Sequence, residues 1–289
     1  MPGTAPPRPS STSHRESAIH LRALTFLAPG IPLRFYEVVT DYLAHEMRCE
    51  ISLASEERIS GPMHGDHDPF AADQADLGFL CSPSFLYLRS RPEPSIELVP
   101  AGFVFRDRRN TTATPVYYSD VIVRTDHPAR TFDDLAGRVW GYNDECSLSG
   151  HFAALQQLQR TGCADDFFGA SRRTGSHLAS IDAVLAGAVD AAAIDSTTMM
   201  LWRRQRPQLG EHLRVIASWG PFPIQPIVLR RGLGEDQARR MASALLQLEC
   251  SQAVASALCE FGLERFVPID ETAYAEERRQ LCALGEIPD

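Results

Sequence analysis

Two serines, a glycine and a histidine stand together at residues 147–151, in the sequence Ser-Leu-Ser-Gly-His. They follow the apolar run RVWGYN and precede GHFAALQQLQRTG, whose periodicity predicts a helix. The first N–H groups of a helix lack partners within it, and together with the helix dipole and two hydroxyls they can bind an anion. Gly150 would let a ligand approach the backbone closely. The alternative is that one serine only caps the helix, which is a common role of serine.

Alternating strands and helices must position this motif. From residue 23 to 105, short apolar runs alternate with segments at helical spacing, such as 32–47, which is typical of a largely parallel, wound α/β sheet. The pattern predicts one strand over 96–105. A second series runs from 116 to 218, and two helical stretches, about 235–260 and 271–283, follow it.

These series predict two α/β lobes with a ligand cleft between them. The chain is expected to cross between the lobes near residues 115–118 and 219–226, because the three prolines of the second segment disfavour a long central strand. Lobe 1 would then comprise 18–116 plus 219–289, and lobe 2 would comprise 117–218. A ligand would occupy the cleft, where loops at the carboxyl ends of strands converge.

Composition excludes several classes of protein. The 289 residues, 44% hydrophobic and 22% charged, can form two buried cores, and no window resembles the ~20 apolar residues of a membrane span. With a net charge of −9 and no basic stripe, nucleic acid is not an expected partner; Arg203–Arg206 is short enough to be a solvated helix end. Seven scattered cysteines without a CxxC pair indicate reduced thiols.

The amino-terminal segment suggests a location. Residues 1–17 are rich in proline, serine and threonine, which predicts a disordered tail, and they lack the apolar centre of a secretory signal. The expected location is therefore the cytoplasm, or the periplasm if a signal has been lost from the sequence.

Several segments, in this order, resemble the phosphonate-binding family of periplasmic-type solute-binding proteins: Asp76-Leu77-Gly78-Phe79-Leu80, Tyr117-Tyr118-Ser119, Asp134-Leu135-Ala136-Gly137-Arg138, Ser147-Leu148-Ser149-Gly150, His177 and Gly187-Ala188-Val189-Asp190-Ala191-Ala192. The resemblance extends from about residue 22 to 245. It implies the type II periplasmic-binding-protein fold, with two hinge crossings and a cleft that closes over its ligand.

The same resemblance implies a set of ligand-binding residues. Phosphonate or phosphate oxygens would be bound by Ser147, the backbone of Leu148, Ser149 and Gly150. Tyr117 would contribute from the crossing strand and His177 from the start of a helix, although a single histidine is more often structural. Side chains alternate along a strand, so only one of Tyr117 and Tyr118 can face the cleft.

Three further polar residues are candidates from the pattern of elements. Asp195 ends the apolar run AAAID, and its carboxylate would either cap the next helix or bind an amine, hydroxyl or acidic proton of the ligand. The second role would favour a zwitterion such as an aminophosphonate. Ser82 and Ser84 follow the third predicted strand and are expected to line the cleft as donors.

Two other groups have the residue types of a reactive site without the spacing. His64-Gly65-Asp66-His67-Asp68 lies in a loop and matches no rigid metal-binding pattern, so no metal site is predicted. Cys146 could be acidified by the neighbouring helix start, but no base is placed beside it, and we expect a packing role.

The sequence thus predicts a protein that binds a small oxyanion, namely phosphonate, phosphite, phosphate or a phosphate ester, without a cofactor. A transport receptor of this kind would have the permease of an ABC transporter as its partner. Two alternatives remain open. One is a cytosolic enzyme on the same fold, similar to chorismate dehydratase, with Asp195, His177 and Tyr117 as acid and base. The other is a cytosolic sensor.

Overall fold

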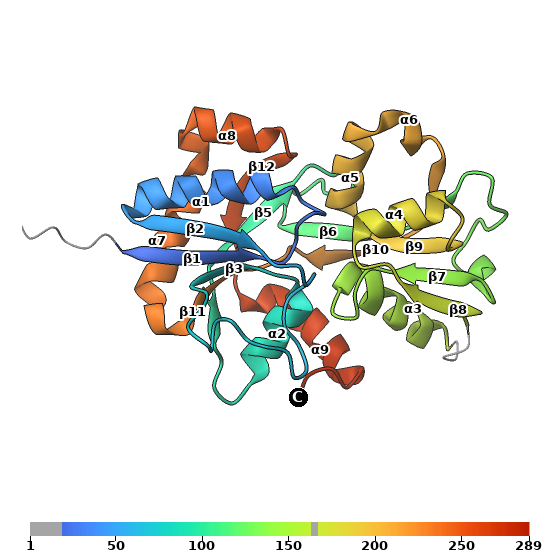
Figure 1. Ribbon diagram of the computed structural model, residues 1–289, viewed down its shortest axis with the longest axis horizontal. Coiled ribbons are helices and arrows are strands. Elements are labelled where there is room, and N and C mark those ends of the chain that lie inside the picture. The colour runs from blue at the N-terminus through green and yellow to red at the C-terminus, as the bar shows by residue number, and fades with distance from the viewer. Residues whose placement is uncertain (1–18, 163–166, 289) are drawn as a thin grey trace, which may run out of the picture.

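The computed structural model describes residues 19–162 and 167–288, so the predicted tail at 1–17 lies outside it. Two α/β lobes lie side by side, with the chain passing between them at the centre of the molecule (Figure 1). The predicted α/β class and two-lobe architecture are confirmed. The exact lobe bounds, 18–116 plus 219–289 and 117–218, stay a prediction. Among the described residues, no helix has the length and apolar character needed to cross a membrane.

The first lobe is built on a five-stranded sheet in the order β2-β1-β3-β11-β4. Its strands are β1 (His20–Thr25), β2 (Glu50–Ser55), β3 (Leu77–Phe79), β4 (Ile96–Leu98) and β11 (Ile227–Arg230). The sheet is parallel from β2 through β3, whereas β11 runs antiparallel to both of its neighbours. The largely parallel sheet expected from the sequence is therefore mixed, because β11 enters it after the chain has returned from the second lobe.

Helices and a two-stranded ribbon surround this sheet. The helices are α1 (Leu33–Met47), α2 (Ser82–Ser90), α7 (Glu235–Leu246), α8 (Gln252–Cys259) and α9 (Ala275–Ala283), and the ribbon pairs β5 (Ala101–Phe105) with β12 (Leu263–Pro268). The single strand expected over 96–105 is divided between the sheet and the ribbon. It breaks at Val99-Pro100, since proline has no N–H to continue a ladder. Phe35 of α1 packs against Phe103, Phe105 and Phe261 in the core.

The second lobe has a sheet in the order β10-β6-β9-β7-β8. Its elements are β6 (Val116–Arg124), β7 (Val139–Tyr142), a π-helical turn (Leu148–Phe152), α3 (Ala153–Thr161), β8 (Ala170–Arg173), α4 (His177–Leu185), β9 (Ala191–Asp195), α5 (Ser196–Gln205), α6 (Pro207–Gly210) and β10 (Leu213–Pro223). Val121 and Val123 of β6 share a core with α3, while Ile122 shares one with α4 and α5. Both faces of the sheet are therefore covered, which explains the uninterrupted apolar run in β6.

The returning strand β10 differs from the expectation. The sequence predicts that regular structure ends near Ser218, but β10 continues to Pro223 and pairs antiparallel with β6. Two features make prolines tolerable there: β10 lies at the edge of its sheet, and its register shifts between Trp219 and Phe222. The chain thus enters the second lobe along β6 and leaves it along β10, which is paired with β6.

Candidate functional site

The Ser-Leu-Ser-Gly motif begins a helix, as predicted. Ser147 is the residue before the π-helical turn, and its Oγ accepts a hydrogen bond from Gly150 N at 3.2 Å. The turn continues into α3, so the first N–H groups of a longer helical segment lie at this point. Ser147 and Ser149 are each 2% exposed. Ser147 therefore does cap the helix, which leaves the Ser149 side chain as the second hydroxyl of the motif.

The two lobes meet tightly around this helix start. Leu148 N donates to Cys81 Sγ, at the start of α2 in the first lobe, over 3.5 Å. Gly30, in the turn between β1 and α1, approaches α5 so closely that a Cβ there would lie 2.8 Å from Thr198 Oγ1. The motif is thus enclosed between the lobes rather than exposed on the second one.

Gly150 is required by its protein neighbours. A Cβ at this position would lie 1.7 Å from Asn143 Oδ1 and 3.2 Å from His177 Cε1. The sequence predicts that the glycine admits a ligand, but in the structure the Asn143 side chain fills that space. Asn143 is 1% exposed, and its Oδ1 has no hydrogen-bond partner among the described residues.

His177 lies beside Ser149, and together with Ser147 and Asn143 these residues form a cluster of polar side chains around the helix start. Ser176 caps α4 by accepting a hydrogen bond from Ala179 N at 3.0 Å, which orients the first residue of the helix, His177. Its Nε2 lies 3.1 Å from Ser149 Oγ. Burial lowers the pKa of His177 to about 4, so its ring is neutral at neutral pH and carries a single N–H donor.

Tyr117 points into the cluster and Tyr118 points away from it. Tyr117 is 1% exposed, and its hydroxyl makes no hydrogen bond within the described residues. Burial raises the pKa of Tyr117 well above its usual value, and the charges of Cys81, Asp195 and Glu277 raise it further. The ring of Tyr118 instead stacks with the Arg109 guanidinium, 4.1 Å from the ring centroid.

Asp195 caps α5, which is one of the two roles that the sequence predicts for it. Its Oδ1 accepts hydrogen bonds from the backbone of Thr197 and Thr198 at 2.7 and 3.0 Å, at the start of α5. Its Oδ2 accepts from Gln225 Nε2 at 2.6 Å. Burial nevertheless raises the pKa of Asp195 to about 6. Both oxygens are engaged by protein donors.

Ser82 and Ser84, at the start of α2, differ from each other. Both are fully buried. Ser84 Oγ donates to the Pro62 carbonyl at 2.6 Å, so its hydroxyl fixes a neighbouring loop. Ser82 Oγ has no hydrogen-bond partner among the described residues. Of the two predicted donors, Ser82 is the one whose hydroxyl is not held by a described hydrogen bond, and it lies near the Glu277 carboxyl.

The comparisons with known proteins agree with this geometry. Residues 34–274 match the family model described as ABC transporter, phosphonate, periplasmic substrate-binding protein. The chain belongs to this family. The match spans most of the sequence and includes every ligand-binding residue predicted from the sequence.

Solved structures of similar fold come from several bacteria. A binding-protein component of a phosphonate transporter from Pseudomonas aeruginosa superposes with a TM-score of 0.77 at 15% identity, over 91% of this chain and 85% of that one. PhnD1 from Prochlorococcus marinus, in complex with methylphosphonate, has a TM-score of 0.73 at 16% identity, over 93% and 99%. The aliphatic sulphonate binding protein SsuA from Escherichia coli has a TM-score of 0.63 at 14% identity, over 94% and 95%. No curated protein matches the sequence.

These matches confirm the type II periplasmic-binding-protein fold and the resemblance to the phosphonate-binding family. They also bear on location: the family description is of periplasmic proteins, so the expected cytoplasmic location has no support. At these identities the structural likeness itself establishes the fold alone.

The structure adds polar residues to the cluster that the sequence does not reveal. Gln225 lies in the proline-rich return segment and reaches Asp195. Tyr36 of α1 is fully buried near Asp195, whose charge contributes to the raised pKa of Tyr36. Glu277 of α9 is 2% exposed, and neither of its oxygens has a hydrogen-bond partner among the described residues. Only long-range packing brings these side chains together.

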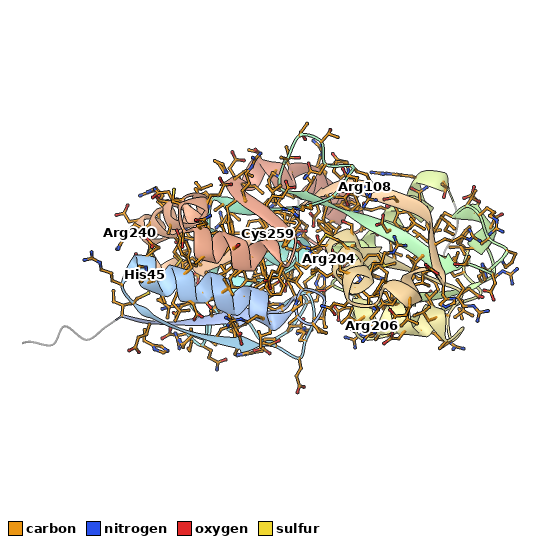
Figure 2. All side chains as sticks on the ribbon, turned by 90° about the horizontal axis from the view of Figure 1, so that it is seen from above. His45, Arg108, Arg204, Arg206, Arg240 and Cys259 are labelled. Atoms are coloured by element: carbon orange, nitrogen blue, oxygen red, sulfur yellow. The ribbon has the colours of Figure 1, made fainter. Side chains whose placement is uncertain are left out.

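The charge of the cluster is unusual for an anion site. Among the described residues no arginine is buried, and the half-buried His177 beside the motif is neutral, so the protein encloses no positive side chain there. Asp195 and Glu277 are buried acids of the cluster without an arginine partner, whereas the buried Asp144, just before the motif, pairs with Arg173 at 2.7 Å. The basic residues at the end of α5 lie on the surface, as Figure 2 shows for Arg204 and Arg206.

The residues considered as metal ligands or as a nucleophile, namely His64, His67 and Cys146, have ordinary surroundings in the structure. His64 Nε2 lies 2.8 Å from Glu286 Oε2, and His67 Nε2 lies 2.6 Å from Gln74 Oε1. Within residues 19–162 and 167–288, no three His, Cys, Asp or Glu side chains gather as a metal site would require. Burial raises the pKa of Cys146 to about 12, which keeps it a thiol and makes it a poor nucleophile.

Proposed function

We propose that the protein captures a phosphonate or a related phosphorus oxyanion between its lobes and presents it to the permease of an ABC transporter. The observation that carries this proposal is the helix start at Ser147–Gly150, enclosed by the opposite lobe and joined by His177. In the proposed complex, ligand oxygens accept hydrogen bonds from backbone N–H groups, Ser149 Oγ and the neutral His177 ring.

The contacts now made at the helix start can be exchanged for contacts with an anion. Thiol sulfur is a weak acceptor, so the 3.5 Å bond from Leu148 N to Cys81 Sγ stabilises little and an oxyanion oxygen would replace it favourably. The hydroxyls of Tyr117 and Ser82 are buried without a described partner, which costs free energy until a ligand supplies one. These groups support a binding role for the enclosed cluster.

Binding is better supported than catalysis. The enzyme alternative would use Asp195 as an acid or base, yet its two oxygens already accept three hydrogen bonds. A proton transfer there would disrupt the cap of α5. The proposed location is the periplasm, as for the family as a whole, and the proposed partner is a permease of that transporter type.

Isothermal titration calorimetry with methylphosphonate, phosphite, phosphate and sulfate tests this proposal. We expect saturable binding of at least one phosphorus oxyanion. Replacing Ser147 and Ser149 together with alanine should weaken that binding about tenfold or more, because Ser149 loses a hydroxyl that donates to a charged ligand, worth about 1.5 to 3 kcal/mol, and Ser147 loses the cap that fixes the helix start.

Ser180→Ala is the matched control, because Ser180 is a buried serine of the same lobe whose hydroxyl is 2.6 Å from Thr174 Oγ1. Its affinity should equal that of the wild type. An unchanged affinity of the double variant would assign Ser147 and Ser149 to capping alone, and a lack of binding to every phosphorus oxyanion would refute the proposed function.

A further inference from the structure

Cys81 of the first lobe contacts the helix start of the second lobe. Its Sγ accepts a hydrogen bond from Leu148 N at 3.5 Å. Cys81 is 5% exposed and Leu148 is fully buried, so this contact lies inside the interface between the lobes. Leu148 and Phe152 also share a hydrophobic core with residues of the first lobe, among them Phe85. The two lobes are therefore joined directly over the Ser-Leu-Ser-Gly motif.

Two helix starts meet at this contact. Cys81 is the residue before α2, and its side chain makes no capping hydrogen bond there. Ser147 is the residue before the π-helical turn that continues into α3. The backbone N–H groups of Ser82, from the first helix start, and Leu148, from the second, both favour the ionised form of the Cys81 thiol. Negative charge is thus favoured at the position of the sulfur from both lobes.

The Cys81 thiol is nevertheless a neutral group. Burial raises the pKa of Cys81, and the charges of Glu277 and Asp195 raise it further. A thiol sulfur is a weak acceptor, whereas the oxygens of a phosphorus oxyanion accept strong, charge-assisted hydrogen bonds. The sulfur therefore occupies a position that an anion would occupy more favourably.

Two buried hydroxyls beside Cys81 point to a ligand independently of the thiol. Ser82, the next residue, is fully buried, and Tyr117 is 1% exposed. Neither hydroxyl makes a hydrogen bond of normal geometry with a described residue. Tyr117 is close enough to Cys81 for the charge of the ionised thiol to raise its pKa. Because a buried hydroxyl without a partner costs free energy, both would gain from an oxyanion in this position.

The thiol and the ligand cannot share the Leu148 N–H. A backbone amide has one hydrogen, and an oxyanion oxygen would accept it at an N···O distance of about 2.9 Å. Ser147 and Ser149 are each 2% exposed, so a ligand reaches them only after the lobes part. Since Cys81 and Leu148 belong to different lobes, this movement breaks the bond between them.

We propose that Cys81 competes with the ligand for the Leu148 N–H: its thiol joins the lobes before a ligand binds, and breaking this contact limits the rate of association. The inference rests on the proposed function, because it concerns the same helix start. It gives Cys81 a role opposite to that of a ligand-binding residue, since the loss of its side chain should favour binding.

Stopped-flow mixing with methylphosphonate, phosphite and phosphate, followed by tryptophan fluorescence, tests this role. In the wild type, the observed rate should reach a plateau as the ligand concentration rises, because the ligand waits for the lobes to part. Cys81→Ala should raise this plateau about threefold or more. Its dissociation rate constant should stay within about twofold of the wild-type value, because the competing contact is absent from the complex.

Cys49→Ala is the matched control, since Cys49 is a half-buried cysteine of the same lobe that packs against the same core. It should keep the wild-type rates. X-ray scattering without added ligand provides a second measurement: Cys81→Ala should have a larger radius of gyration than the wild type, and Cys49→Ala should not.

An observed rate that rises linearly up to the highest ligand concentration would refute the inference in the wild type alone, even if Cys81→Ala does not fold. An unchanged plateau or radius of gyration in Cys81→Ala would also refute it. Faster dissociation from Cys81→Ala would refute it as well, because Cys81 would then contact the ligand. A lack of binding to all three oxyanions would refute the proposed function, and the scattering would still decide whether Cys81 joins the lobes.

Discussion

Two buried carboxyl groups face the same cluster from opposite lobes, and their surroundings differ. Asp195 ends a strand of the second lobe, where two backbone N–H groups and the Gln225 amide stabilise its charge. Glu277 lies on a helix of the first lobe and is as deeply buried, but it makes no hydrogen bond of normal geometry with a described residue, and only the nearby Ser82 hydroxyl lowers its pKa. The difference teaches that burial alone does not mark a ligand-binding acid. Burial raises the pKa of Asp195 to about 6 and that of Glu277 to about 8, so the protein donors around Asp195 offset more of the cost of burying its charge.

The largest expected effect concerns Glu277 and pH. Its folded-state pKa of about 8 exceeds the ordinary value of 4.5, so between these pH values the folded protein holds a proton that the unfolded chain has lost. Stability therefore falls as pH rises through this window. One held proton changes the unfolding free energy by about 1.4 kcal/mol per pH unit, so Glu277→Gln should gain about 4 kcal/mol on the wild type between pH 5 and pH 9.

Urea unfolding of both proteins at pH 5, 7 and 9 measures this gain. The neighbouring Cys81, Tyr117 and Tyr274 have pKa values raised above their ordinary ones, so they stay neutral over most of the window. Asp195 is present in both proteins and cancels in the comparison. A difference in unfolding free energy that is the same at all three pH values would mean that Glu277 is ionised and already compensated.

Asp195→Ala should have the next largest effect, on stability. The change removes the cap of α5, worth about 1 kcal/mol, and leaves the buried Gln225 amide without its acceptor, so we expect a loss of about 3 kcal/mol in unfolding free energy at pH 4. The loss should be smaller at pH 7, because the pKa of Asp195 is raised to about 6 and its ionised form is itself costly to bury. Asp182→Ala is the control, since Asp182 is an exposed residue 3.6 Å from Arg206, and it should change stability by less than about 0.5 kcal/mol. An Asp195→Ala variant as stable as the wild type at pH 4 would show that these hydrogen bonds do not hold the start of α5.

The smallest expected change in stability concerns two buried serines of α2, of which one has a hydrogen-bond partner and the other does not. Ser84→Ala removes a donor from the buried Pro62 carbonyl and should cost about 1 to 2 kcal/mol of unfolding free energy. Ser82→Ala removes a hydroxyl that makes no hydrogen bond of normal geometry with a described residue and that favours only the ionised form of Glu277, so it should cost close to nothing at pH 5. Urea midpoints of the two variants at pH 5, where Glu277 is protonated, provide the comparison. Equal losses would show that Ser82 has a structural partner.

The sequence predicted the parts of the site that depend on local structure. Ser147 and Asp195 were expected at helix starts because each follows a strand and precedes a periodic segment, and both do cap helices. The family resemblance was predicted from several short segments in their order along the chain. The two-lobe fold was predicted from the alternation of strands and helices. The ligand roles of Tyr117, Ser149 and His177 stay predictions.

Long-range packing explains what the sequence could not predict. Glu277 stands in the run Ala-Glu-Glu-Arg-Arg-Gln, where nothing local distinguishes it from the exposed Glu276. It is buried only because α9 folds back against the crossing, far along the chain from the oxyanion motif. Gln225 lies in a segment that the prolines predicted as a linker, yet its amide completes the surroundings of Asp195. Such contacts leave no periodicity in the sequence.

The pairing of β6 with β10 has a consequence for how the two lobes can move. These strands are the connection about which one lobe could rotate relative to the other, and points near an axis of rotation move least. Tyr117 and Phe222, one on each strand, would therefore keep their contact during such a rotation, and the face away from the strands would move most.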